Sequence, residues 1–105
     1  MYTVNIWLRR KDGMPEDEFR RYWVETHAPI ARDGYEFLRS YVVSFVTGAP
    51  RGQEAPYDGI AELSWDTRED FAADMKSDAA RRGTEDLENF TSSFGLVFVE
   101  KQDVK

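Results

Sequence analysis

Six segments of this chain differ in the spacing of their apolar residues, and their order restricts the possible folds more than any other feature. Four of them alternate polar and apolar residues or are rich in β-branched and aromatic residues. They predict strands at Tyr2–Arg9, Leu38–Thr47, Tyr57–Trp65 and Phe94–Glu100. Two segments with helical spacing separate the first strand from the second and the third from the fourth. The order β-α-β-β-α-β predicts an α+β, ferredoxin-like fold, with two helices on one face of a four-stranded antiparallel sheet.

The first helical segment carries one continuous apolar stripe. Its members follow the helical pattern i, i+3, i+4, i+7 and i+11: Phe19, Tyr22, Trp23, Thr26 and Ile30. Pro15 suits the first position of this helix. Pro29 disfavours a helical conformation at Ala28, so we expect the helix to end near His27. Residues 31–37 would then form a connection to the second strand.

The second helical segment follows the third strand directly. Asp66 with Glu69 is typical of a capping box, so we expect the helix to begin there. Its apolar stripe consists of Phe71, Ala72, Met75 and Ala79. We expect Gly83 to interrupt the helix, with a short irregular or helical piece at residues 84–90. Residues 48–56 are rich in glycine and proline, which predicts a loop between the second and third strands.

His27 is the only histidine in the chain and the main candidate for acid–base chemistry. It follows Trp23 by four residues, so its ring lies on the same side of the helix as the apolar stripe. At a helix C-terminus the dipole favours the protonated ring, whereas apolar neighbours favour the neutral ring. Such a histidine suits proton transfer near neutral pH, but a histidine that only caps the helix would occupy the same position. The residues alone leave both interpretations open.

The distribution of apolar residues over the sheet predicts a second copy of the chain. The second and fourth strands are apolar on both faces, although the two helices can cover only one. A homodimer with its sheets face to face would cover the other, and each subunit would enclose a small-molecule cavity between its sheet and its helices. Candidate walls, each of which could instead be ordinary packing, are Trp7, Tyr41, Phe45, Trp65 and Phe94. Asn5, in mid-strand, needs a hydrogen-bond partner or a hydrated cavity.

Composition excludes several classes of protein. A chain of 105 residues is one domain, residues 1–105. The absence of cysteine excludes disulfides and thiolate catalysis, and a single histidine excludes a multi-histidine metal site within one chain. A net charge of −6 disfavours nucleic acid as a partner. No apolar run could span a membrane and no signal-peptide pattern is present, so we expect a soluble, cytoplasmic protein.

Several stretches of the chain resemble the EthD family. The stretch Phe19-(x)2-Tyr-Trp-(x)3-His-Ala-Pro29, preceded by Arg10-Lys-Asp-Gly13, is similar to the opening of that family. Three later stretches of the chain are similar to the second half of that family: Tyr57-Asp-Gly-Ile-Ala-Glu-Leu-Ser-Trp65 with Asp66, then Glu88-Asn-Phe90 and Val97-Phe-Val-Glu100. Two positions depart from the pattern. Met14 stands where the family often has a serine or threonine helix cap, and Asn5 replaces a residue that is usually apolar.

The resemblance implies a dimeric α+β barrel. The family takes its name from a gene cluster for degrading a fuel ether, where the protein accompanies a haem monooxygenase and its redox partners. Related barrels include polyketide cyclases, lactone isomerases, dehydratases, quinol-forming monooxygenases and haem-degrading enzymes, and most need no organic cofactor. By this resemblance His27 corresponds to the family's histidine and is the candidate catalytic residue. The candidate substrate-binding residues are Asn5, Trp7, Trp23, Tyr41, Trp65, Asn89 and Phe94.

Four functions follow as hypotheses. The first is a cofactor-independent lyase or isomerase that acts by proton transfer on a small aromatic, polyketide-like or lactone substrate, with His27 as general base or acid. The second is a monooxygenase of phenols or quinols. The third is an accessory protein that binds a hydrophobic intermediate without catalysis, and the fourth is haem binding through His27. We favour the first, although a fold with many chemistries leaves the substrate open.

Overall fold

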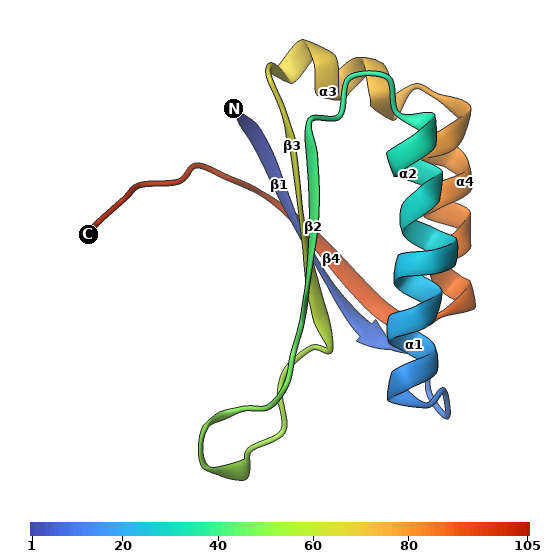
Figure 1. Cartoon of the computed structure of the whole chain (residues 1–105), viewed down its shortest axis with the longest axis vertical. Coiled ribbons are helices and arrows are strands. Elements are labelled where there is room, and N and C mark those ends of the chain that lie inside the picture. The colour runs from blue at the N-terminus through green and yellow to red at the C-terminus, as the bar shows by residue number, and fades with distance from the viewer.

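All the α-helices of the chain lie on one side of a single antiparallel sheet. The computed structural model describes residues 1–105. Its strands are β1 (Tyr2–Arg10), β2 (Ser40–Phe45), β3 (Gly59–Trp65) and β4 (Thr91–Val99). Their order in the sheet is β2-β3-β1-β4, and each neighbouring pair is antiparallel. Figure 1 shows the layer of α-helices on one side of this sheet and, on the other, the C-terminal tail and the loop between β2 and β3, which carries the short 3₁₀ turn η2 (Pro50–Gly52). The predicted ferredoxin-like α+β fold is confirmed, with strand ends that differ from the prediction by at most three residues.

The first helix does not end at His27, so this part of the prediction is wrong. α1 (Glu16–Tyr22) continues through η1 (Trp23–His27), which is a π-helical turn, into α2 (Ala28–Gly34). The backbone N–H of Ala28 donates to the carbonyl of Trp23, five residues back. Pro29 then falls in the first turn of α2, the part of a helix where proline is tolerated. The connection that we expected from residue 31 begins only after Gly34.

The second helix begins one residue later than the predicted capping box. α3 (Arg68–Met75) is capped by Thr67, not by Asp66, and the Thr67 hydroxyl accepts the backbone N–H of Asp70 at 3.1 Å. Asp66 instead pairs with Arg39 across the start of β2. Either residue can cap a helix, so the sequence pattern did not separate them.

The interruption that we expected at Gly83 lies earlier in the chain. α4 (Asp78–Asp86) runs through Gly83 and ends in a short 3₁₀ turn, η3 (Leu87–Asn89). The break falls at Ser77, whose hydroxyl accepts the backbone N–H of Ala80 at 3.2 Å and starts the new helix. A side-chain cap is therefore a stronger signal here than the weak helix-breaking tendency of one glycine.

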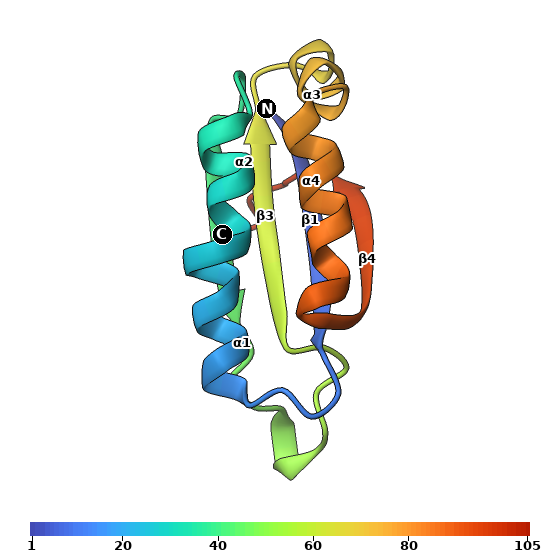
Figure 2. The same ribbon diagram turned by 90° about the vertical axis from the view of Figure 1, so that its right-hand side faces the viewer.

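The two helical columns lie side by side over the sheet. Figure 2 shows α1 and α2 as one column and α4 as the other, with β3 visible between them and β4 at the outer edge. The fully buried apolar core between helices and sheet consists of Val4, Leu8, Phe19, Trp23, Ala61, Leu63, Trp65 and Phe90. Trp23 packs so closely on β3 that a Cβ at Gly59 would lie 2.5 Å from its ring. None of the helices is long and apolar enough to cross a membrane.

The other face of the sheet is covered by no helix. A row of paired residues crosses this face from edge to edge: Val42, Glu62, Asn5 and Val97. The two valines at its ends are 54% and 52% exposed. The Oδ1 atom of Asn5 is buried and accepts no hydrogen bond within the chain. An apolar face that also holds an unsatisfied polar atom is incomplete in a single chain.

Candidate active site

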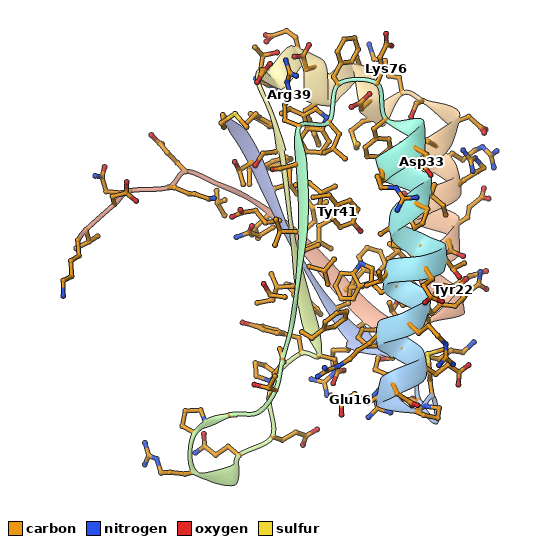
Figure 3. All side chains as sticks on the ribbon, viewed as in Figure 1. Glu16, Tyr22, Asp33, Arg39, Tyr41 and Lys76 are labelled. Carbon is orange, nitrogen blue, oxygen red and sulfur yellow. The ribbon has the colours of Figure 1, made fainter.

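A largely apolar cavity of about 150 Å³ lies between the sheet and the helices. Its floor is the helix-facing side of the sheet, including Ile6 and Leu63, and its roof includes Trp23 and His27 from the π turn. Tyr41 reaches the same cavity from β2, and Figure 3 shows this side chain pointing from the strand toward the helices. The cavity is therefore a hydrophobic chamber with a few polar groups in its wall.

The imidazole of His27 has one nitrogen engaged and one free. Its Nδ1 lies 2.8 Å from Oδ2 of Asp86, and both side chains are only 13% exposed. Burial lowers the pKa of His27 below its ordinary value, although the hydrogen bond and the charge of Asp86 oppose this shift. The neutral ring therefore dominates at neutral pH. Nε2 makes no hydrogen bond within the chain, so it is the nitrogen available to a ligand in the cavity.

Asp86 is held by three donors, and this fixes the tautomer of His27. Besides His27, the hydroxyl of Tyr22 donates to Oδ1 at 2.6 Å and the side-chain amide of Asn89 donates to Oδ1 at 2.9 Å. Burial alone would raise the pKa of Asp86, but these hydrogen bonds and the charge of His27 keep it below its ordinary value. An ionised carboxylate can only accept, so Nδ1 of His27 carries the proton and Nε2 carries the lone pair. Nε2 is thus arranged as a base.

Two tyrosines place hydroxyl groups at the cavity. The hydroxyl of Tyr41 accepts the indole N–H of Trp23 at 3.1 Å, and its own proton has no acceptor within the chain. Burial raises the pKa of Tyr41 above its ordinary value, so the hydroxyl stays protonated. Burial, followed by the proximity of Tyr41 and Asp74, raises the pKa of Tyr35 to about 12. Both groups can therefore donate to an oxygen atom of a ligand.

The structure brings five of the candidate residues together around this cavity: Trp23, His27, Tyr41, Trp65 and Phe94. Asn89 does not line it but reaches His27 indirectly, through Asp86. The indole N–H of Trp65 donates to the buried carboxylate of Asp74 at 2.7 Å, so the Trp65 ring contributes only its apolar surface.

Asn5 and Trp7 lie on the opposite face of the sheet and do not line the cavity. Asn5 belongs to the row that crosses the open face, and Trp7 lies on that face against Gly95, where a Cβ would be 2.3 Å from its ring. Alternation along β1 predicts that these two residues share a face of the sheet. It does not predict which face the helices cover, because both faces of the sheet carry apolar residues. Their contact with a substrate stays a prediction.

Asp86, Tyr22 and Tyr35 are site residues that the sequence analysis did not identify. Asp86 lies 59 residues after His27 along the chain. It looks like any surface carboxylate of an acidic helix, and only the packing of α4 beside the first helix brings it to the ring. No group of three or more histidine or carboxylate side chains lies close enough together to hold a metal ion.

Comparison with known proteins gives the family and the fold of the chain. The family model described as the EthD domain matches residues 11–93. A search of curated proteins gives no match. An ethyl tert-butyl ether D family protein from Bacillus halodurans has a TM-score of 0.80 at 24% identity, covering 97% of this chain and 100% of that chain.

Two other solved structures share the fold at lower identity. A dimeric ferredoxin-like protein of unknown function from Thermobifida fusca has a TM-score of 0.70 at 14% identity, covering 93% of this chain and 88% of its own. A proposed antibiotic biosynthesis monooxygenase from Nitrosomonas europaea has a TM-score of 0.65 at 13% identity, covering 96% of this chain and 98% of its own. At these identities the likeness is one of fold.

Proposed function

Because this chain belongs to the EthD domain family, as its sequence resemblance predicted, we propose that it is a small, cofactor-independent enzyme of the lyase or isomerase type. It acts by proton transfer on a small aromatic, polyketide-like or lactone substrate. The observation that carries the proposal is His27, whose Nδ1 is held by an ionised Asp86 and whose Nε2 is free at an apolar cavity. An apolar protein cavity of roughly 150 Å³ can bind benzene, so the size supports a substrate with one ring in this chamber.

The geometry supports a specific division of labour. Nε2 of His27 takes a proton from a carbon atom beside a carbonyl group, and Asp86 stabilises the imidazolium that forms. The carbonyl oxygen gains negative charge and accepts a hydrogen bond from Tyr41. The proton then returns from Nε2 to another carbon in an isomerase, or to a leaving hydroxyl group in a dehydratase.

The functional unit in this proposal is a homodimer. The open face of the sheet carries half-exposed valines and the unsatisfied Oδ1 of Asn5, and a second copy could cover the former and supply a donor to the latter. A ferredoxin-like protein with the same fold is described as dimeric. The cavity of each subunit lies between the sheet and the helices, on the side away from the dimer interface. The second copy would therefore stiffen the sheet under the cavity without closing the cavity.

The test is hydrogen–deuterium exchange at carbon, because it detects proton abstraction without knowledge of the product. Small lactones, aryl ketones and cyclic diketones are incubated with the protein in D₂O, and the loss of their C–H signals is followed by NMR. We expect the protein to accelerate exchange for at least one compound. His27→Gln should slow it by about 10²- to 10⁴-fold, the usual contribution of a general base.

Asp86→Asn should also slow the exchange, because an amide no longer imposes the Nδ1–H tautomer on His27. Asp78→Asn is the matched control, since Asp78 is an exposed carboxylate on the same helix that pairs only with Arg81 and Arg82. Exchange that is as fast in His27→Gln as in the wild type would exclude the proposed role. Tight binding without exchange would instead favour the accessory binder.

A monooxygenase of phenols or quinols is the second candidate. Its support is the largely apolar cavity with its aromatic lining, together with the shared fold of a proposed antibiotic biosynthesis monooxygenase. Oxygen uptake with a panel of phenols separates the two functions. Uptake that depends on the protein would favour this candidate, and its absence alongside carbon exchange would favour the first.

A further inference from the structure

The carboxylate of Asp86 joins two side chains of the same helix. Tyr22 donates to its Oδ1 at 2.6 Å, which is the shortest of the three hydrogen bonds on this carboxylate, and His27 donates to its Oδ2 at 2.8 Å. Tyr22 and His27 are five residues apart in the sequence. This spacing is unusual for two side chains that bind one group.

An ordinary α-helix would not allow this arrangement. At 3.6 residues per turn, residues five apart point in directions that differ by about 140°. The π turn at Trp23–His27 changes the geometry, because its backbone hydrogen bonds span five residues, as the bond from Ala28 to Trp23 does. Residues five apart then lie nearly above one another, and both Tyr22 and His27 face α4.

We propose that Tyr22 is a positioning residue for His27, acting through Asp86, and that the π turn is the element that brings the two onto one carboxylate. Oδ1 of Asp86 has only one other donor, the exposed side chain of Asn89. Without Tyr22 the carboxylate can rotate, and Nδ1 of His27 loses its fixed acceptor. The ring is then free to place its proton on Nε2, where it cannot act as a base. Only the effect on turnover rests on the proposed function.

Outside the network of Tyr22, His27, Asp86 and Asn89, no titratable side chain shifts the pKa of His27 or of Asp86. Asp86 is the only charged group that shifts the pKa of His27, and the pKa of Asp86 responds only to Tyr22, Asn89 and His27 besides burial. Tyr22 itself stays protonated, because burial and then Asp86 raise its pKa. A change in the ring of His27 can therefore be assigned to this network.

The test uses Tyr22→Phe, which removes the hydroxyl and keeps the ring that packs on Phe90 at 5.0 Å between centroids. Nitrogen-15 NMR of the single histidine reads the tautomer directly, at a pH where the ring is neutral. We expect the Nδ1–H form in the wild type and a mixture with the Nε2–H form in Tyr22→Phe. With a substrate that shows His27-dependent exchange, kcat should fall by about tenfold or more with little change in KM.

Tyr57→Phe is the matched control, because Tyr57 stacks on Trp7 at 6.3 Å and its hydroxyl makes no hydrogen bond within the chain. Asn89→Ala removes the other donor to Oδ1 of Asp86 from an exposed position, and it should shift the tautomer of His27 in the same direction. This second variant serves as the test if Tyr22→Phe folds poorly. A tautomer in Tyr22→Phe and Asn89→Ala identical to that of Tyr57→Phe would overturn the proposal. If the wild-type protein shows no His27-dependent exchange of carbon-bound hydrogen, the proposed function is wrong. The tautomer of His27 in the variants would still decide whether Tyr22 positions the ring.

Discussion

His27 shows how two opposed influences on one side chain give a defined protonation state. Burial favours the neutral ring, and the ionised Asp86 favours the protonated ring. Burial is the larger influence, so the pKa of His27 lies below its ordinary value while the carboxylate still fixes the tautomer. The sequence predicted opposed influences, but it assigned the favourable one to a helix C-terminus, and the structure places His27 inside a continuous helix.

This pKa predicts a pH dependence of stability. The unfolded chain takes up a proton on His27 as the pH falls below about 6.5, before the folded chain does, so the free energy of unfolding decreases in that range. Asp86 acts in the same direction only below pH ~4, because its pKa is lowered from an already acidic value. Between pH 8 and pH 5, urea unfolding should show a larger loss of stability in the wild type than in His27→Gln. Parallel curves for the two proteins would show that the pKa is not lowered.

Within the candidate site, the sequence was informative about residues that carry their own signal. His27 and Trp23 stand at helical spacing, and alternation places Tyr41 and Phe94 on regular positions of their strands, so the structure could gather them at one cavity. Asp86 carries no such signal, because its role depends on a contact between helices that are far apart in the sequence. Pairings of this kind follow from tertiary packing, which a local pattern does not encode.

At the scale of elements, the contact between α2 and α4 holds Asp86 beside His27. Two glycines lie at this contact, and the space around them differs. A Cβ on Gly34 would lie 2.5 Å from the Cβ of Ala79, whereas a Cβ on Gly83 would meet Ile30 at 3.8 Å, an ordinary contact. The first glycine permits the close approach of the helices. The second only weakens α4.

Alanine substitutions at these glycines should therefore have opposite effects. Gly34→Ala should lower the free energy of unfolding by about 1–3 kcal/mol, as overpacking does. Gly83→Ala should raise it by roughly 0.5–1 kcal/mol, because alanine is the better helix former and has room. Urea unfolding of both variants, with Gly48→Ala as the control in open space, measures this. A neutral Gly34→Ala would mean that α2 and α4 separate more easily than their packing indicates.

The predicted elements were correct in type and order, and the errors lie where two local signals competed. Pro29 normally ends a helix, but the π turn before it moves the proline into a first helical turn. Gly83 is a weak helix breaker, and the Ser77 cap, two residues after the end of α3 at Met75, determines the true break instead. Neither competition can be resolved from spacing alone, because each depends on backbone hydrogen bonds that the folded chain selects.

At the scale of the whole molecule, the two faces of the sheet have different roles. The helix-facing side forms the floor of the cavity, and the open side carries Val42 and Val97 at the ends of one row. The cavity and the open face are separated by one layer of strands. Substitutions on the open face can therefore change assembly while the groups at His27 stay in place.

Val97→Asp should convert the proposed dimer into a monomer. It would place two new carboxylates in the interface, one in each copy beside Asn5, at a position where the valine is now 52% exposed. Val24→Asp is the matched control, because Val24 is 49% exposed but lies on the first helix, on the other side of the sheet. Sedimentation equilibrium gives the mass of each protein. A monomeric wild type, or a dimeric Val97→Asp, would contradict the face-to-face assembly.

The π turn also has a meaning for how such a site arises and disappears. It corresponds to one residue more than an α-helical turn would contain. Removal of one residue between Tyr22 and His27 would leave them four apart on a regular helix, where their directions differ by only about 40°. Both side chains would still face α4, so the π turn lets the first helix hold one additional residue without changing the face that it presents on either side of the turn. Straightening the turn at the present spacing would instead separate the two side chains by about 140° and take one of them away from Asp86.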